Sequence, residues 1–184
     1  MKTKVKELLE AIAQKDLNAL GLLYEEVARQ VFNYIRSITL CKETAEDVLH
    51  DVFMQIYDNA ARISRADEPM AYIMRIARNR AYNIWKGEKR TLTGIEADGV
   101  SEDTASHIIA KLEFEEAYDA LPQKQRETIY LHLYCGFSHD EVAAIQGVPA
   151  VTAKWRYRKA LSKLKESLSE GEFIIYETSR VDHP

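Results

Sequence analysis

Residues 138–165 read SHDEVAAIQGVPAVTAKWRYRKALSKLK, and this stretch decides the fold of the C-terminal part of the chain. Ser138 is a favourable N-cap, and Glu141 three residues later completes the pattern of a capping box, which predicts a short helix. Gly147 ends this helix, and a short turn leads into a longer basic helix over about 150–168. A short capped helix, a turn and a longer basic helix are together typical of a helix-turn-helix.

The longer helix of this motif has two faces of different chemistry. The face expected to pack inward carries Ala153, Tyr157, Ala160, Leu161 and Leu164. The opposite face carries Lys154, Trp155, Arg158 and Lys159, with Arg156 at its flank within reach of a phosphate. A helix fits the major groove, where base edges present a unique pattern of donors and acceptors. The outer face therefore predicts DNA binding. The alternative is a basic face that is only solvated and binds no partner. The Trp155 ring could also fold back onto the domain instead of contacting DNA.

Positive charge is concentrated in two short segments of an acidic chain. The net charge is -4, which by itself argues mildly against a nucleic-acid partner. Residues 70–90, however, hold 6 basic and 1 acidic residue, and residues 150–165 hold 6 basic and no acidic residue. These segments contain 12 of the 25 positive charges, and DNA binding depends on the local field more than on the total charge.

The first basic segment is predicted to be a helix that opens at Pro69, because proline is tolerated in a first helical turn. One stripe of this helix carries Arg75, Arg78, Tyr82, Lys86 and Lys89, flanked by Asn79 and Trp85. Cations interleaved with aromatic rings are suited to single-stranded or melting DNA, since the rings stack on exposed bases. The alternative is a solvated basic face with half-buried aromatic side chains.

A third helix, predicted over 43–58, has an acidic face. Its apolar stripe is formed by Ala45, Val48, Leu49, Val52, Phe53 and Ile56. The opposite face carries Asp47, Asp51, Gln55 and Asp58. A charged helix face of this kind is usually no more than solvated, so the pattern alone assigns it no partner.

The chain is expected to be all-α, with two small helical domains joined by a flexible linker. Residues 91–106 (TLTGIEADGVSEDTAS) hold two glycines, four acidic residues and little apolar periodicity, which predicts the linker. A long loop within one domain is less typical of compact proteins. Residues 1–90 would then form the first domain and residues 107–170 the second. The tail over 171–184 has no role that its sequence indicates.

Three stretches, in this order, resemble the extracytoplasmic-function (ECF) sigma factors, which carry sigma-70 regions 2 and 4 only and bring RNA polymerase to promoters. They are AEDVLHDVFMQIY (45–57), PMAYIMRIARNRAYNIWKGEKR (69–90) and ALPQKQRETIYLHLYCGFSHDEVAAIQGVPAVTAKWRYRKALSKLKE (120–166). Each motif alone is moderately specific, whereas the ordered set with an acidic linker between is highly specific. The resemblance covers about residues 5–168.

The resemblance implies a role for each helix. The 45–58 helix would dock on the clamp of core RNA polymerase through Glu46, Asp47, Asp51 and Gln55. The 69–90 helix would recognise the −10 element, together with the loop at about 61–68, which in the family captures a flipped base. Its implied contacts are Arg75, Arg78, Asn79, Tyr82, Trp85, Lys86 and Lys89. The 150–165 helix would read the −35 element through Lys154, Trp155, Arg156, Arg158 and Lys159.

The resemblance also implies partners, and several residues depart from the family pattern. Core RNA polymerase and promoter DNA are the expected partners, an anti-sigma factor is expected to hold the protein inactive, and the linker would pass near the RNA path. Asn83 replaces a common Asp, Trp155 a common Ser, and Pro149 a Ser or Thr cap. The −35 preference of relatives therefore does not transfer to this chain.

Other classes of protein are less well supported. His139-Asp140-Glu141 has no second ligand set at the spacing of a metalloenzyme, so we expect no enzyme, metal or cofactor. A helix-turn-helix regulator acting without core polymerase would leave residues 45–90 unexplained. No apolar run would span a membrane, which predicts a cytoplasmic protein. Cys41 and Cys135 are expected to be reduced and partly buried, with a redox pair as the alternative.

Overall fold

The computed structural model describes residues 2–39, 41–88 and 116–167, and within these ranges it contains helices and short connections but no strand. The elements are α1 (Lys2–Ala13), α2 (Leu17–Thr39), α3 (Lys42–Ile63), α4 (Pro69–Glu88), α6 (Gln123–Ile129), the π-helical turn η1 (Tyr130–Tyr134), α7 (His139–Gln146) and α8 (Ala150–Ser167). The all-α prediction is confirmed. The predicted linker over 91–106 and the tail over 171–184 lie outside the described residues.

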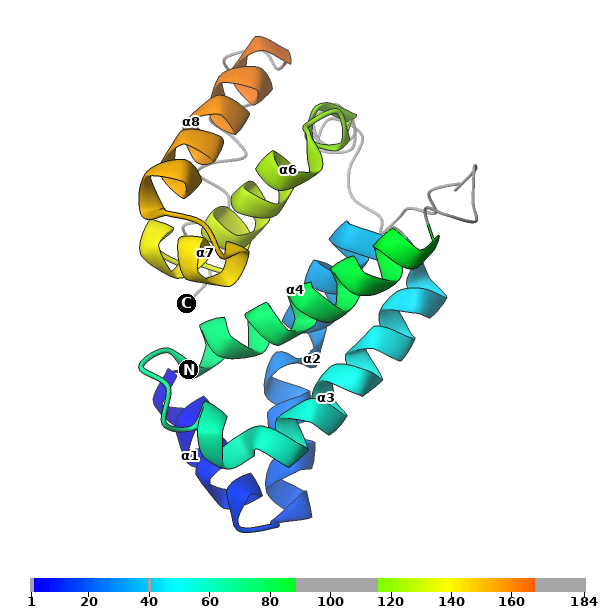
Figure 1. The fold of residues 1–184 in the computed structure, drawn as a ribbon, viewed down its shortest axis with the longest axis vertical. Helices are drawn as coiled ribbons and strands as arrows, with labels where there is room; N and C mark the ends of the chain where they lie inside the picture. Colours follow the sequence, from blue (N-terminus) through cyan, green and yellow to red (C-terminus); the bar gives the residue numbers. More distant parts are fainter. Residues whose placement is uncertain (1, 40, 89–115, 168–184) are drawn as a thin grey trace, which may run out of the picture.

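Helices α1 to α4 form an N-terminal unit (residues 2–88) around one apolar core (Figure 1). Each helix contributes the stripe that its helical periodicity predicts, and side chains such as Leu23 and Ile56 are fully buried. Asp16 caps α2, since its Oδ1 accepts hydrogen bonds from the backbone N–H of Asn18 (2.9 Å) and Ala19 (3.3 Å). The predicted start of the next basic helix at Pro69 is confirmed, since α4 begins there.

Helix α3 is longer than its sequence pattern predicted. It continues beyond residue 58 to Ile63, across a kink where Asn59 has φ -115° and ψ 15°. Ala60 and Ile63 are buried, so the last turn is fixed by packing on the core. The connection predicted over 61–68 consequently begins only at Ser64, which corrects the expected helix boundary.

The C-terminal unit (residues 116–167) contains the predicted helix-turn-helix. Ser138 Oγ accepts from the Glu141 backbone N–H (3.2 Å) and Glu141 Oε2 accepts from the Ser138 N–H (2.7 Å), so the capping box is complete. Gly147 ends α7 in the left-handed conformation with φ 65°, which a residue without Cβ adopts at little cost. Ala160 and Leu164 of α8 pack with Leu121 and Ile129 in a small core.

The two units pack against each other instead of lying apart. Figure 1 shows α7 of the C-terminal unit beside α4, and α6 approaches α2. Phe137, Val142 and Ile145 are buried in the same apolar cluster as the N-terminal core. Since α4 is the helix predicted to bind −10 DNA, the packing of α7 determines which parts of that helix face solvent. In the part of the chain that the structure describes, no helix is both long and apolar enough to span a bilayer.

Candidate nucleic-acid interface

The outer face of α8 is open to solvent along its basic side. Ala153, Ala160 and Leu164 are buried, as the helical pattern predicted. The side chains facing outward are Lys154, Trp155, Arg158 and Lys159. Trp155 is 55% exposed, so its indole is not folded back onto the domain and can reach a base edge or a thymine methyl group. Val151, 71% exposed, adds an apolar contact point that the sequence did not single out.

Arg156 has a different environment from its neighbours on α8. Its Nη1 donates a hydrogen bond to Gln146 Oε1 at 2.7 Å, and Gln146 Nε2 donates to Thr128 Oγ1 at 3.0 Å. Gln146 is 4% exposed, so these contacts join α8, α7 and α6 through the interior of the unit. The guanidinium of Arg156 therefore holds the second helix of the motif against the first, whereas the prediction had placed it at the flank of the DNA face.

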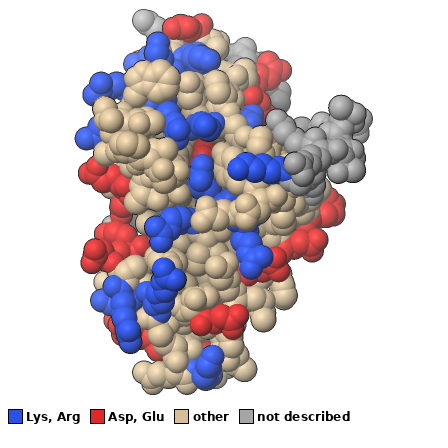
Figure 2. Space-filling view, in the orientation of Figure 1, with Lys and Arg blue, Asp and Glu red and all other residues tan. Residues whose placement is uncertain are grey.

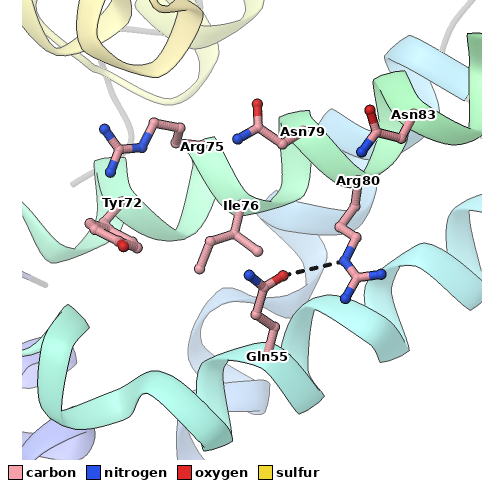
Figure 3. A pocket seen from close by; sticks show the side chains of 7 residues that line it. All are labelled: Gln55, Tyr72, Arg75, Ile76, Asn79, Arg80 and Asn83. Carbon is pink, nitrogen blue, oxygen red and sulfur yellow. Dashed lines mark hydrogen bonds between the residues drawn. The ribbon is translucent and has the colours of Figure 1, made fainter.

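Helix α4 and α3 border a polar hollow of about 610 Å³. Its lining, drawn in Figure 3, consists of Gln55, Tyr72, Arg75, Ile76, Asn79, Arg80 and Asn83. The Arg75 guanidinium lies over the Tyr72 ring at 4.6 Å from its centroid, a favourable cation–π arrangement. Arginine and amide groups around a hollow supply donors for phosphate and both donors and acceptors for base edges.

Arg80 connects two surfaces that the sequence had treated separately. Its Nε donates to Gln55 Oε1 at 3.3 Å (Figure 3). Its Nη1 also pairs with Asp51 Oδ2 at 3.4 Å. Gln55 and Asp51 belong to the predicted polymerase-binding set, whereas Arg80 follows Asn79 of the predicted −10 set. Sequence reasoning missed Arg80 because it lies off the stripe through Arg75 and Tyr82, although it is one of the six cations in that segment.

The remaining predicted −10 residues are distributed over three environments. Lys86 is exposed, and Lys89 lies outside the described residues. Trp85 is half-buried and meets the edge of Tyr82 at 5.9 Å between ring centroids. Arg78 and Tyr82 face the C-terminal unit, where both contact the Glu127 carboxylate. The structure therefore brings Arg75 and Asn79 together at the hollow and places Arg78 and Tyr82 against the other unit.

Basic side chains of both units are visible on one face of the molecule. In Figure 2, Lys and Arg gather over the C-terminal unit and across the middle of the view, where α4 lies in Figure 1. The two basic segments that the sequence distinguished are therefore seen from the same side, although acidic side chains surround them. A surface of this kind attracts the phosphate backbone at low and moderate salt.

The acidic face of α3 points to solvent beside an apolar groove. Glu46, Asp47 and Asp51 are exposed and Gln55 is half-buried. A neighbouring hollow of about 480 Å³ between α2 and α3 is lined by Leu17, Leu20, Gly21, Tyr24, Glu46, Leu49, His50, Phe53 and Met54. Leu17 and Met54 are 65% and 50% exposed. The sequence did not single out Leu17 and Met54, because they come from different helices and meet only in the fold.

Titratable groups near these surfaces do not form a metal site or a disulfide within the described residues. His132 and His139 stack at 4.2 Å between ring centroids, and both contact the Tyr157 ring. Burial, followed by the nearby His132, lowers the pKa of His139 below the ordinary value of histidine. Cys135 is a free thiol beside Gln30 of α2, and burial raises its pKa to about 12.

Two family descriptions match the chain in the order of its two units. Sigma-70 region 2 matches residues 23–91, and Sigma-70 region 4 matches residues 111–164. The first covers α4 with its polar hollow, and the second covers the helix-turn-helix with the exposed face of α8. An all-helical chain with these two regions in this order falls in the class of sigma-70-type transcription factors, which are DNA-binding regulatory proteins.

Curated relatives specify the family within that class. The ECF RNA polymerase sigma factor EcfG of Rhodopseudomonas palustris is 32% identical over 132 residues, which are 68% of this chain and 72% of the relative. The ECF RNA polymerase sigma factor SigK of Mycolicibacterium vanbaalenii is 25% identical over 171 residues, covering 88% of this chain and 87% of the relative. The chain belongs to the ECF sigma factors of RNA polymerase.

Solved structures share the fold at lower identity. The sigma factor RpoE of Bartonella quintana, solved with the anti-sigma factor NepR, has a TM-score of 0.66 and 22% identity over 80% of this chain and 94% of its own. CnrH, solved with the cytosolic domain of CnrY, has a TM-score of 0.64 and 18% identity over 89% of this chain and 96% of its own. The helical arrangement described above is therefore shared with known sigma factors.

Proposed function

We propose that this ECF sigma factor binds promoters through two separate helices, α8 at the −35 element and α4 at the −10 element. The observation that carries the proposal is the exposed face of Lys154, Trp155, Arg158 and Lys159 on the second helix of a capped helix-turn-helix. Such a helix is of the right size for the major groove, and the indole and cations supply apolar and charged contacts. In this arrangement residues 1–90 are the region 2 domain and residues 107–170 the region 4 domain.

The polar hollow beside α4 is the proposed site for unpaired bases of the −10 element. Arg75 and Asn79 border it from α4, and Tyr72 supplies an aromatic ring. A base that leaves the duplex loses stacking worth a few kcal/mol, which a ring and amide or guanidinium donors can offset. Lys86 lies three residues beyond Asn83 of the hollow on the same helix, and its exposed side chain is available to a DNA phosphate.

The acidic face of α3 is the proposed docking surface for core RNA polymerase. Its exposed carboxylates are those of Glu46, Asp47 and Asp51. Charge complementarity at a rim speeds encounter and orients the partner, and the adjoining apolar groove with Met54 supplies area that can be desolvated. Polymerase then performs the chemistry in the cytoplasm, so no catalytic residue, metal or cofactor is assigned to this chain.

An anti-sigma factor is the proposed negative regulator. The support is the fold shared with RpoE and CnrH, each of which was solved with a protein partner. A partner that covers the basic faces of α4 and α8 would prevent promoter binding. Full promoter-specific transcription by this chain in cells without any inducing signal would contradict this regulation.

The test of the DNA assignment is transcription in vitro by reconstituted holoenzyme. A promoter is first selected from a randomised library. Lys154→Ala is then compared with Lys163→Ala, which changes another exposed lysine of α8 outside the predicted face. Loss of a base-reading contact should reduce −35-dependent initiation by about 1–3 kcal/mol, or roughly 5- to 150-fold. Lys163→Ala should have little effect.

Two outcomes would contradict the assignment. Equal activity of both variants would exclude a base-reading role for Lys154. Failure of the chain to bind core polymerase, together with tight binding to a palindromic DNA, would instead favour a regulator that acts without polymerase. The matched lysines carry the same charge on the same helix, so a difference between them reports position and not net charge.

A further inference from the structure

Glu127 of α6 is a buried carboxylate whose hydrogen-bond donors come from the other unit. Its side chain is 2% exposed. Oε1 accepts from Arg78 Nε at 2.5 Å and from the Tyr34 hydroxyl at 2.6 Å, and Oε2 accepts from the Tyr82 hydroxyl at 3.2 Å. These four residues, called the Glu127 network below, join α6 to α2 and α4. Both carboxylate oxygens are therefore satisfied by the N-terminal unit.

A buried carboxylate is strongly unfavourable unless cations and hydrogen-bond donors surround it. The donors of Glu127 are present only while the two units are packed together. The burial and hydrogen bonding of the carboxylate therefore depend on the relative position of the units. Burial, followed by the negative charge of Glu127, raises the pKa of Tyr34 and Tyr82, to about 12 for Tyr82. Both phenols therefore stay protonated and able to donate at neutral pH.

Contacts around the Glu127 network support the same closed arrangement. The rings of Tyr34 and Tyr130 are stacked with centroids 5.9 Å apart, and the Tyr130 hydroxyl donates to the Gln30 carbonyl of α2 at 3.4 Å. The Cys135 thiol lies beside the Gln30 side chain. The π-helical turn that carries Tyr130 thus lies directly on α2, with a cysteine at the border of the two units.

The packing of the two units engages Arg78 and Tyr82, and this is how it would affect promoter binding. Both residues lie on the α4 stripe that the sequence assigns to −10 DNA. A guanidinium binds carboxylate and phosphate with similar geometry, and a phenol donates to either. Glu127 presents its two oxygens to Arg78 and Tyr82 in the way that a phosphate of bound DNA would.

We propose that Glu127 acts as an internal substitute for a DNA phosphate and holds the region 4 unit over part of the −10 face, so that the free protein is autoinhibited. This inference rests on the proposed function of α4, because only a DNA-binding Arg78 makes the contact inhibitory. Single-stranded DNA and the C-terminal unit compete for the same side chains. Opening of the units exposes Arg78 and Tyr82 and leaves Glu127 accessible to water.

The test compares Glu127→Gln with Glu116→Gln in the full-length chain. Both variants remove one negative charge from the C-terminal unit, but residue 116 is exposed and outside the Glu127 network. Opening is measured by alkylation of Cys135, whose thiol loses the Gln30 contact when the units separate, with Cys41 on the N-terminal unit as internal reference. DNA binding is measured with a fluorescent single-stranded oligonucleotide of random sequence.

Glu127→Gln should accelerate alkylation of Cys135 relative to Cys41. It should also increase affinity for the oligonucleotide about 5-fold or more, the lower end of the usual coupling between two sites. Glu116→Gln should leave the alkylation ratio unchanged. Its affinity for the oligonucleotide shows how much the removal of one negative charge alone changes DNA binding. If Glu127→Gln matches Glu116→Gln in both measurements, the autoinhibitory contact is excluded.

A second variant tests whether the effects of Glu127→Gln arise from unfolding of the C-terminal unit. Tyr34→Phe removes one donor to Glu127 without changing the shape of a fully buried ring, and Tyr34 is outside the predicted DNA set. It should give a smaller increase of Cys135 alkylation with unchanged helical circular dichroism. Faster alkylation without any DNA binding by wild type or variants would contradict the proposed role of α4, and with it the inhibition, while the closed packing itself would stand.

Discussion

Tyr82 presents its hydroxyl group to a buried carboxylate instead of to solvent. Burial contributes most to the raised pKa of about 12, and the negative charge of Glu127 comes next. The neutral phenol is therefore favoured in the folded protein, relative to an unfolded chain whose tyrosines ionise near 10. The corresponding stabilisation is fully present below about pH 10 and is lost as the pH rises to about 12.

An alkaline titration should detect this single residue among ten tyrosines. The tyrosinate absorbance of the wild-type chain minus that of Tyr82→Phe should rise with a midpoint near pH 12, because the substitution removes one late-ionising phenol. The same difference measured in concentrated denaturant should have its midpoint near 10. A folded-state midpoint at the denatured value would mean that Tyr82 is not packed against Glu127 in solution.

Helix α7 depends on a local device at its N-terminus and on its position between α4 and α8. The side chain of Ser138 and the side chain of Glu141 satisfy each other's backbone N–H groups. These N–H groups have no partner in the helix itself, so a missing cap leaves them to water. The helix is short, which gives each terminal hydrogen bond a large share of its stability.

Ser138→Ala should lower the free energy of unfolding by about 0.5–2 kcal/mol, as for other lost N-caps. The measurement is the midpoint and slope of urea unfolding. Ser162→Ala is the matched control, since Ser162 is an exposed serine whose hydroxyl only donates to Glu166 (3.1 Å) along α8. Its effect should stay within about 0.5 kcal/mol. Equal losses for the two substitutions would argue against the capping box.

Features that depend on a few neighbouring residues were predictable from the sequence. The capping box, Pro69 at the start of α4 and the glycine at the end of α7 follow from local chemistry and occur as predicted. The end of α3 was not predictable in this way. Ala60 and Ile63 continue the helix past a kink because tertiary packing buries them, and no local signal marks that turn.

The contact between the two units could not be predicted from the sequence. Glu127 is one of 11 acidic residues between 91 and 149, and nothing in its neighbours distinguishes a buried carboxylate from a solvated one. Its partners Tyr34, Arg78 and Tyr82 are 93, 49 and 45 residues away along the chain. Most contacts that close an interface likewise join residues that are far apart in the sequence. The basic faces of α4 and α8 could be predicted as helical stripes, but which part of α4 is covered could not.

At the scale of the whole molecule, the proposed polymerase-docking face of α3 and the proposed −10 site beside α4 share a border. Asp51→Arg should weaken binding to core polymerase by roughly tenfold or more, because it reverses a charge on the docking face. It also places a second cation opposite Arg80, which now pairs with Asp51 and contacts Gln55 at the polar hollow. Binding to fluorescently labelled core polymerase, followed by competition with unlabelled chain, measures the effect.

Glu10→Arg is the control for this charge reversal. Glu10 is an exposed residue of α1, outside the proposed docking face, and the substitution changes the net charge by the same amount. It should leave core binding unchanged. An equal loss for the two variants would show that polymerase responds to overall charge, and no loss for Asp51→Arg would remove the acidic face of α3 from the interface.

The position of Glu127 has a consequence for protein engineering. A hybrid sigma factor would join the proposed −35-binding unit of one protein to a unit of another that carries the proposed polymerase-docking and −10 surfaces. In this chain the two halves share a buried ionic contact, with the carboxylate on one half and the guanidinium and phenols on the other. A graft that supplies an apolar residue at position 127 would leave Arg78 without its counter-charge, so the halves of a functional hybrid must be matched at this pair as well as at their promoters.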